Sequence, residues 1–413
     1  MRHLNVYLNA EPVGTLEQDD NGLLKFRYGM EWLNRPDAAP LSRSLPLQRE
    51  PFNGKRARPF FAGILPEEEP RRKIAAILGI SERNDFAMLE RIGGECAGAV
   101  SLLSEDMPPP APGKLSVREL DEKELQEIII SLPRRPLMAD QDGLRLSLAG
   151  AQDKLPVLMR GSSIALPLDN TPSTHIIKPE PERLPGLVAN EAYCMTLAKK
   201  VGLNVPLVAI RPVGDKPCIV VQRYDRIISP EGTIVRVHQE DFCQALGFPP
   251  ERKYQQEGGP LVRDCVEMLR EWSTTPVLDI RDFIDGLIFN VLIGNADAHG
   301  KNYSLLYSGG GRRLAPFYDL VCTLAWPELS KTPAMKIGKS DSIKTITAAN
   351  WRKMTQETRL GWPMARERVM ELSQKTLDLL REPQVINTAG GDAMCGRVAA
   401  IIEERASSML RIV

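Results

Sequence analysis

The chain has 413 residues, more than one hydrophobic core usually serves, so we expect two or more structural units. Lys and Arg total 53, as do Asp and Glu, so the formal net charge is zero. A chain without a basic surplus is not expected to bind nucleic acid directly. Its seven scattered cysteines never follow a CxxC spacing, which indicates reduced thiols and a cytoplasmic location. The most apolar run, residues 287–293, is too short to cross a membrane, so no membrane partner is expected.

The N-terminal part of the chain shows strand patterns before helical ones. Residues 3–9 alternate apolar and polar side chains and predict a strand, and residues 23–28 predict another. Residues 67–92 change to a helical pattern, in which Asp85 is expected as the N-cap of a helix. These patterns predict a first α+β unit over residues 1–106.

A proline-rich segment follows this unit. Residues 107–113, MPPPAPG, can sustain neither a helix nor a central strand, because proline lacks an amide donor and restricts its neighbour. We therefore expect a linker over residues 107–115. Ser116 and Glu119 have capping-box spacing, which predicts a helix that ends near Pro133.

The rest of the chain is first rich in strands and then in helices. Residues 144–159 predict a strand, a turn and a second strand, and residues 174–180 form a short β-branched run. Residues 190–201 have helical periodicity, and residues 216–226 read as a strand and a connector. Residues 279–293 carry a continuous apolar stripe and predict a buried helix.

A loop directly after this predicted buried helix carries the spacing D-x-x-x-x-N, from Asp297 to Asn302. In kinases this spacing joins a catalytic Asp to an Asn that binds Mg²⁺. By itself the loop could equally be a polar turn at the end of a helix. Asp319, at the end of the hairpin expected after Asn302, is where a second magnesium ligand would be placed.

Lys178 supplies a candidate contact to the phosphates of ATP. It follows the β-branched residues of the run 174–180, just before the helix that carries Glu191, a candidate ion-pair partner of the kinase type. Taken singly, Lys178 could point to solvent, and exposure of Glu191 is an open alternative. The inference therefore depends on the combination and order of these residues.

A short run of small residues, AGAQDK, could bring backbone amides close to an anion, although an ordinary hairpin turn would look similar. Its residues are Ala149, Gly150, Ala151, Gln152, Asp153 and Lys154. The four histidines are not spaced as a zinc pair, and no GxSxG motif is present, so zinc and hydrolase chemistry are not indicated.

These motifs together resemble the HipA family of kinase-fold toxins. The blocks LSLAGAQDK, THIIKPE, NEAYCMTLAKKVGLNVP, VVQRYDR, QEDFCQALG, KYQQEGGP, NADAHGKN and APFYDL stand in the family's order. FFAGILPE and GGECAGAV resemble its N-terminal domain. The resemblance implies an α+β fold in which a protein-kinase-like bilobal unit follows a small N-terminal α+β domain. We accordingly divide the chain into an N-terminal domain, a linker, a β-rich lobe and a helical lobe: residues 1–106, 107–115, 116–250 and 251–413.

The resemblance also assigns roles within an ATP and Mg²⁺ site. It implies that Asp297 is the catalytic base, that Asn302 and Asp319 bind Mg²⁺, and that Lys178 contacts the ATP phosphates. It places the AGAQDK run on the phosphates. The remaining implied nucleotide contacts are a hinge of Gln222, Arg223 and Tyr224, together with His299, Gly300, Lys301, Asn302 and Tyr318.

Family resemblance further implies a non-specific serine/threonine-protein kinase that phosphorylates an aminoacyl-tRNA synthetase, such as the glutamyl enzyme, and thereby causes growth arrest and persistence. Autophosphorylation at Ser147 would switch it off. Its implied partner is a HipB-like DNA-binding antitoxin, through which it would reach DNA indirectly as a co-repressor. Two alternatives stay open: a catalytically silent partner of the antitoxin, and a small-molecule kinase.

Overall fold

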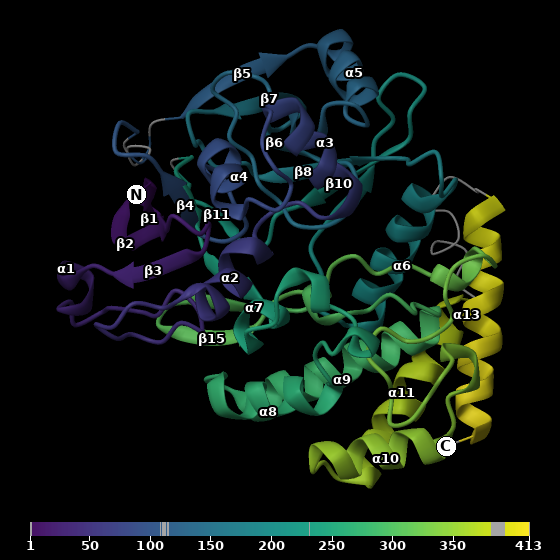
Figure 1. Cartoon of the computed structure of the whole chain (residues 1–413). Coiled ribbons are helices and arrows are strands. Elements are labelled where there is room, and N and C mark those ends of the chain that lie inside the picture. The colour runs from purple at the N-terminus through teal and green to yellow at the C-terminus, as the bar shows by residue number, and fades with distance from the viewer. Residues whose placement is uncertain are drawn as a thin grey trace.

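The computed structural model describes residues 2–107, 109, 113, 115–230, 232–380 and 393–412. Figure 1 shows the N-terminal strands beside the β-rich middle of the chain, with the later helices packed below them. The predicted linker falls partly outside the described residues, so the division into domains stays a prediction. No helix within the described ranges has both the length and the apolar character needed to cross a bilayer.

The N-terminal unit is an antiparallel sheet in the order β3-β2-β1-β4, with helices packed against it. Its strands are β1 (Arg2–Leu8), β2 (Glu11–Gln18), β3 (Leu24–Tyr28) and β4 (Val100–Leu103). Its helices are α1 (Met30–Leu33), α2 (Gly54–Gly63), α3 (Glu68–Leu78) and α4 (Asp85–Ile92). The strand β2 was not predicted from the sequence.

The prediction that Asp85 caps α4 is wrong by one residue. Asn84 is the N-cap, and its side-chain oxygen accepts a hydrogen bond of 3.0 Å from the backbone N–H of Ala87. The Asp85 carboxylate is instead buried between Arg58, at 2.7 Å, and Arg71, at 2.5 Å. Both residue types serve as caps, so the sequence alone did not distinguish them.

The second sheet runs in the order β5-β7-β6-β8-β10-β9 and is antiparallel between all paired strands. Its strands are β5 (Ser116–Leu120), β6 (Leu155–Arg160), β7 (Ser163–Leu168), β8 (His175–Pro179), β9 (Val208–Ile210) and β10 (Cys218–Gln222). The predicted cap at Ser116 is wrong, because Ser116 begins β5. The capping box belongs to Asp121 and Glu124 at the start of α5 (Glu122–Ser131).

The segment before β6 is extended but is not a strand of this sheet. Its backbone bonds to Glu95 of the N-terminal unit instead: the Glu95 N–H donates to the Arg145 carbonyl at 2.7 Å, and the Ser147 N–H donates to the Glu95 carbonyl at 2.9 Å. The predicted strand is therefore absent, and this segment is instead hydrogen-bonded to the N-terminal unit.

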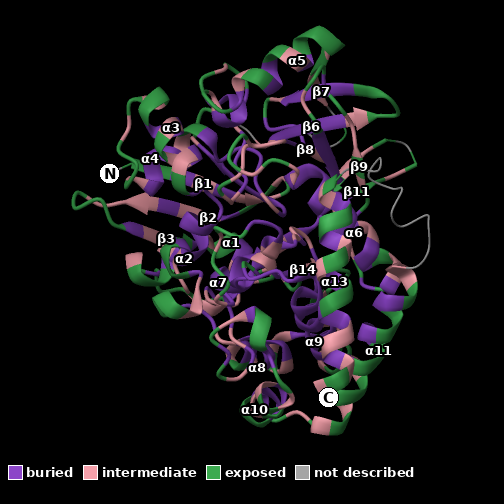
Figure 2. Ribbon diagram, turned by 90° about the vertical axis from the view of Figure 1, so that its right-hand side faces the viewer, coloured by how far each residue is buried: buried purple, intermediate pink, exposed green. Residues whose placement is uncertain are grey.

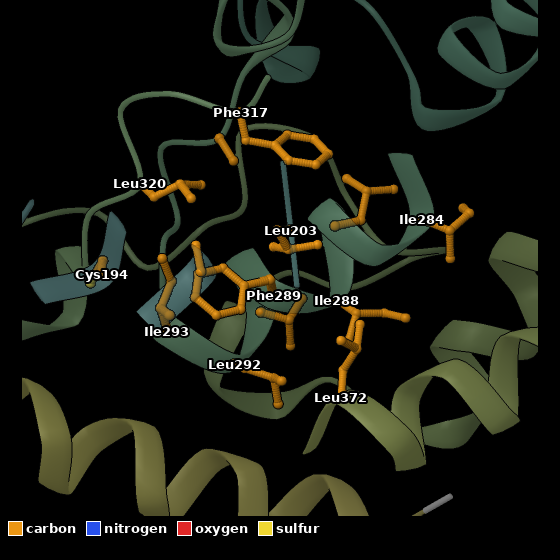
Figure 3. Close-up of a cluster of buried hydrophobic side chains, with 14 of the residues drawn as sticks. Cys194, Leu203, Ile284, Ile288, Phe289, Leu292, Ile293, Phe317, Leu320 and Leu372 are labelled. Carbon is orange, nitrogen blue, oxygen red and sulfur yellow. The ribbon is translucent and has the colours of Figure 1, made fainter. Parts of the chain in front are cut away.

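The helical part of the chain surrounds α9 (Pro276–Ile293), which packs against α8, α11 and α13. The other helices are α6 (Leu187–Val201), α7 (Phe242–Leu246), α8 (Val262–Trp272), α10 (Ala348–Thr358), α11 (Trp362–Leu380) and α13 (Ala393–Ile412). Figure 3 shows Phe289, Leu292 and Ile293 of α9 among the buried side chains of this core. The predicted helix over residues 279–293 is thus confirmed, with one additional N-terminal turn that begins at Pro276.

Short strands connect the two large parts of the fold. A small sheet joins β13 (His238–Asp241), β14 (Ser304–Ser308) and β15 (Gly311–Leu314), and a hairpin pairs β11 (Arg226–Ile228) with β12 (Ile234–Arg236). The predicted hairpin after Asn302 is present, but β15 ends at Leu314, so Asp319 lies in the irregular segment beyond it.

Two large hydrophobic clusters hold the molecule together. One surrounds α9, and the other joins residues of the N-terminal sheet, such as Val6 and Phe26, to residues of the second sheet, such as Leu155 and Ile177. Figure 2 shows the strands β6 and β8 largely buried, whereas outer turns of α5 and α13 are exposed. The N-terminal unit and the β-rich lobe therefore share one core.

Candidate active site

The loop that carries Asp297 begins where α9 ends. Gly294 closes the helix in the left-handed conformation, with φ of 71°. Asn295 then donates to Asn290 Oδ1 at 2.8 Å and accepts from the Asp297 N–H at 3.0 Å. The Ala296 N–H donates to Thr323 Oγ1 at 2.9 Å. These bonds attach the loop to the end of a buried helix.

The Asp297 carboxylate has a neighbour that the motifs did not reveal. The Tyr254 hydroxyl donates to Asp297 Oδ1 at 2.9 Å. Burial raises the pKa of Asp297, while the Tyr254 hydrogen bond and the charge of Lys253 act in the opposite direction. The Asp297 side chain thus has a hydrogen-bond partner on Oδ1, and it lines an open cleft.

Lys178 forms the ion pair with Glu191 that the sequence suggested, and a second ion pair with Asp319 that was not predicted. Its Nζ is 2.7 Å from Glu191 Oε1 on α6 and 2.5 Å from Asp319 Oδ1. Burial disfavours the charged form of Lys178, but Asp319 and Glu191 outweigh this effect and raise its pKa. A permanently charged lysine is therefore held at the cleft wall.

Asp319 and Asn302 offer oxygen ligands of the type that Mg²⁺ prefers. Asp319 has a φ of 54°, which is unusual for a residue other than glycine, and its side chain is 45% exposed. Asn302 Oδ1 accepts from the His299 N–H at 3.0 Å and so faces back into the loop. No group of three or more His, Cys, Asp or Glu residues in the described ranges forms a metal cage. One carboxylate and one amide, completed by phosphates and water, nevertheless fit a magnesium ion.

The predicted phosphate loop lies against the N-terminal unit. The Glu67 N–H donates to the Gly150 carbonyl at 3.3 Å, and Lys154 Nζ donates to the Ala149 carbonyl. Gly150 has a φ of 104°, a backbone conformation that residues with a side chain rarely adopt, so glycine is strongly favoured there. Burial, together with the nearby charge of Lys178, lowers the pKa of Lys154 to about 8.

The other loop members have distinct environments. Within the described residues, the buried Gln152 Nε2 has no hydrogen-bond partner, so it is available to a ligand. Burial raises the pKa of Asp153, whereas Ala151 is exposed. The loop thus presents backbone, one amide and one lysine to the cleft.

The hinge segment begins at the end of β10. The Gln222 N–H donates to the Leu207 carbonyl at 2.9 Å, and the Tyr224 ring stacks on Tyr318 with centroids 5.9 Å apart. The Tyr318 hydroxyl donates to the Lys301 carbonyl at 2.7 Å. Gln222, Tyr224, Tyr318 and Lys301 all line the cleft.

Arg223 and Lys301 line the cleft in which nucleotide contacts were predicted, and their charged groups are bonded within the protein. The Arg223 guanidinium bonds to Glu95 at 3.0 Å and to Asp225 at 2.8 Å. Lys301 Nζ bonds to Asp241 at 2.7 Å and to the Gly63 carbonyl at 2.9 Å. Both cations are buried, and their bonds to Glu95 and to the Gly63 carbonyl connect the N-terminal unit to the rest of the chain.

His299 and Gly300 are packed into the loop. Burial and the charge of Lys253 lower the pKa of His299 to about 3, so its imidazole is neutral. Its Nδ1 atom has no hydrogen-bond partner within the described residues. A Cβ on Gly300 would lie 2.8 Å from Cys243 Sγ, so the close packing requires glycine.

Ser147 is fully buried. Its relative exposure is 0%, and its hydroxyl donates to the Ile64 carbonyl of the N-terminal unit at 3.2 Å. A kinase could reach this hydroxyl only after the segment around it had moved out.

Of the candidate site residues, all except Ser147 and Gly300 line one cleft with a volume of about 1860 Å³. It brings together the phosphate loop, Lys178, the hinge, the loop from Asp297 to Asn302, and Asp319. Sequence reasoning missed Tyr254, Lys253 and Glu67 in its wall. KYQQEGGP contains the first two and was recognised only as a family block, and no local pattern marks Glu67.

Both parts of the chain match HipA families. Residues 146–380 match the HipA-like C-terminal domain, and residues 4–103 match the HipA N-terminal domain. The putative kinase Y4mE of Sinorhizobium fredii is 46% identical over 92% of this chain and 91% of its own length. The serine/threonine-protein kinase toxin HipA of Shewanella oneidensis is 32% identical over 84% of this chain and 81% of its own.

A solved structure gives the same result for the fold. Shewanella oneidensis HipA, in its complex with HipB and operator DNA, superposes with a TM-score of 0.82 and 26% sequence identity. The match covers 99% of this chain and 100% of that one. The predicted fold class, a kinase-like bilobal unit behind a small N-terminal α+β domain, is confirmed. The chain belongs to the HipA family.

Proposed function

We propose that the protein is a serine/threonine-protein kinase that uses ATP and Mg²⁺. The observation that carries this proposal is Lys178, which is bonded to both Glu191 and Asp319 in the cleft that also contains Asp297. Transfer of a phosphoryl group requires a lysine on the phosphates, oxygen ligands for the metal and a base for the acceptor. Each of these groups has a residue of the right chemistry here.

The chain's own residues divide the reaction between them. Lys178 and Lys154 attract the phosphates, and Asn302 and Asp319 would hold Mg²⁺, which would supply positive charge against the phosphates. Asp297 accepts the proton of a Ser or Thr hydroxyl as the oxygen attacks the γ-phosphorus. The bond from that phosphorus to the β-γ bridging oxygen breaks, and ADP leaves.

The first experiment measures ³²P transfer from [γ-³²P]ATP to candidate proteins. The wild type should label a protein substrate, and Asp297→Gln should reduce the rate by about 10²- to 10⁴-fold, the usual contribution of a general base. We propose an aminoacyl-tRNA synthetase, such as the glutamyl enzyme, as the substrate, so that blocked aminoacylation causes growth arrest and persistence. Equal labelling by wild type and variant would contradict the kinase assignment.

A catalytically silent binding protein and a small-molecule kinase are the alternatives. Thermal shift with ATP and Mg²⁺ tests the former, because a scaffold without a nucleotide site gains no stability from the ligand. Nucleotide binding without labelling of any protein in a lysate would favour the small-molecule kinase.

We also propose a HipB-like antitoxin as partner, with the chain acting as co-repressor. The support is the Shewanella oneidensis relative, solved with HipB and operator DNA. Zero net charge agrees with DNA contacts made mainly through the partner. A gel shift of operator DNA should show a slower complex only when both proteins are present.

Ser147 is the proposed site of inactivating autophosphorylation. Its support is position: Ser147 lies two residues before the phosphate loop and contacts the N-terminal unit. A phosphate of charge about −2 could not return to this buried place beside a polyphosphate site. Intact mass after incubation with ATP should show one added phosphate, which Ser147→Ala should abolish.

A further inference from the structure

Tyr254 contacts the candidate base, Asp297, but has no role in the proposed mechanism. Its hydroxyl donates to Asp297 Oδ1 at 2.9 Å, and its ring packs edge-on against His299 with centroids 5.2 Å apart. A carboxylate with one oxygen held in this way keeps its other oxygen for an incoming hydroxyl.

The backbone around Tyr254 is fixed to the same loop as Asp297. The Gln255 N–H donates to the Ala334 carbonyl at 2.9 Å, and the Ala334 N–H donates to the Ala296 carbonyl at 2.8 Å. Ala334 therefore bridges the residue after Tyr254 and the residue before Asp297. The phenol and the carboxylate have little freedom to move apart.

The N-terminal unit reaches Tyr254 through Lys253. Lys253 Nζ lies 2.8 Å from Glu67 Oε2, 3.2 Å from Glu68 Oε1 and 5.4 Å from the centre of the Tyr254 ring. Lys253 is buried, as is Glu67, which also lies 3.6 Å from Lys301 Nζ. Two carboxylates of the N-terminal unit thus hold the cation beside the ring.

We infer that Tyr254 is a positioning residue for Asp297, and that Glu67 and Glu68 of the N-terminal unit hold it in place through Lys253. This inference rests on the proposed kinase function. The phenol restricts rotation of the Asp297 carboxylate so that its free oxygen faces the acceptor. The N-terminal unit is then part of the catalytic apparatus, although it lies far away in sequence.

The kinetic experiment compares Tyr254→Phe with Tyr193→Phe. Tyr193 is buried on α6, and its hydroxyl has no hydrogen-bond partner within the described residues, so its loss is a matched control. Transfer of ³²P to glutamyl-tRNA synthetase should show kcat reduced about tenfold in Tyr254→Phe, with KM for ATP unchanged, because one charge-assisted hydrogen bond is lost. Wild-type kcat in Tyr254→Phe would overturn the inference, as would phosphorylation of Tyr254 itself, which would make it an acceptor.

A spectroscopic experiment works without catalysis. In a protein with 3-fluorotyrosine at position 254, the ¹⁹F resonance should move in Asp297→Asn and in Glu67→Gln. It should stay fixed in Glu357→Gln, a control in which the altered carboxylate pairs with Lys353 on α10. If the resonance does not move in Asp297→Asn, the contact between Tyr254 and Asp297 is contradicted. If it does not move in Glu67→Gln, the proposed support of Tyr254 by Glu67 through Lys253 is contradicted. Failure of the wild type to transfer phosphate to any protein would instead contradict the proposed function, and the ¹⁹F result would still decide the contacts.

Discussion

Lys154 lies in the cleft and changes its charge near pH 8. Its pKa is lowered to about 8 by burial, so it is mainly protonated at pH 7 and mainly neutral at pH 9. Bound phosphate favours the charged form, so the affinity for ATP should fall as pH rises through 8, by up to about tenfold per pH unit. Titration calorimetry at pH 7 and pH 9 measures this change. Lys154→Met should bind more weakly at pH 7 and lose most of the dependence.

Spacing in the sequence located the residues that act through their type and order. Asp297, Asn302, Asp319 and Lys178 were expected at one site, and all line one cleft. Spacing could not locate Tyr254, because its role depends on a contact with a loop 43 residues away.

Two of the predicted nucleotide-contact residues illustrate a further limit of sequence motifs. Arg223 and Lys301 lie within family motifs, yet their charged groups bond to Glu95, Asp225 and Asp241. A motif gives the position of a side chain along the chain. It does not say which unit supplies the opposite charge.

At the scale of elements, hydrophobic periodicity located several helices and strands. It failed where backbone groups form hydrogen bonds with a distant part of the chain. The predictions for β8, α6, β10 and α9 agree with the structure, since each has a clear apolar pattern. The strand expected before the phosphate loop does not form. Its N–H and carbonyl groups bond to Glu95, a partner that no local pattern identifies.

At this scale, we predict that a negative charge at position 147 displaces the phosphate loop. Its docked position depends on the Ser147 hydroxyl at the Ile64 carbonyl and on the contact of Gly150 with Glu67. Ser147→Asp places an unpaired carboxylate in this dry site, so the loop should leave it. Amide hydrogen exchange should become faster across residues 146–154, and ATP affinity should fall. Ser147→Ala, which loses one neutral bond worth about 1 kcal/mol, should keep both near wild type. Unchanged exchange in Ser147→Asp would contradict this account of the loop.

At the scale of the whole molecule, the N-terminal unit and the β-rich lobe are joined by a shared apolar cluster and by a buried charge network. Glu95 is central to that network: its carboxylate lies 3.0 Å from Arg223 and 2.6 Å from Arg226. A boundary in the sequence at the proline-rich segment suggests separable domains. The shared core indicates instead that these two units unfold together.

Glu95→Gln tests this coupling, because it leaves two buried guanidinium groups without their common partner. Loss of one member of a buried ion pair costs about 3–5 kcal/mol. Burial opposes ionisation of Glu95, but Arg223 and Arg226 outweigh it and lower the pKa. The ion pair therefore stabilises the fold above the unfolded pKa, and this stability is lost as pH falls through the lower folded pKa. Calorimetry at pH 7 should show a lower Tm for Glu95→Gln than for wild type, and a smaller difference in acid. The N-terminal unit and the β-rich lobe should still melt in one transition, and two separate transitions for them would contradict the shared core.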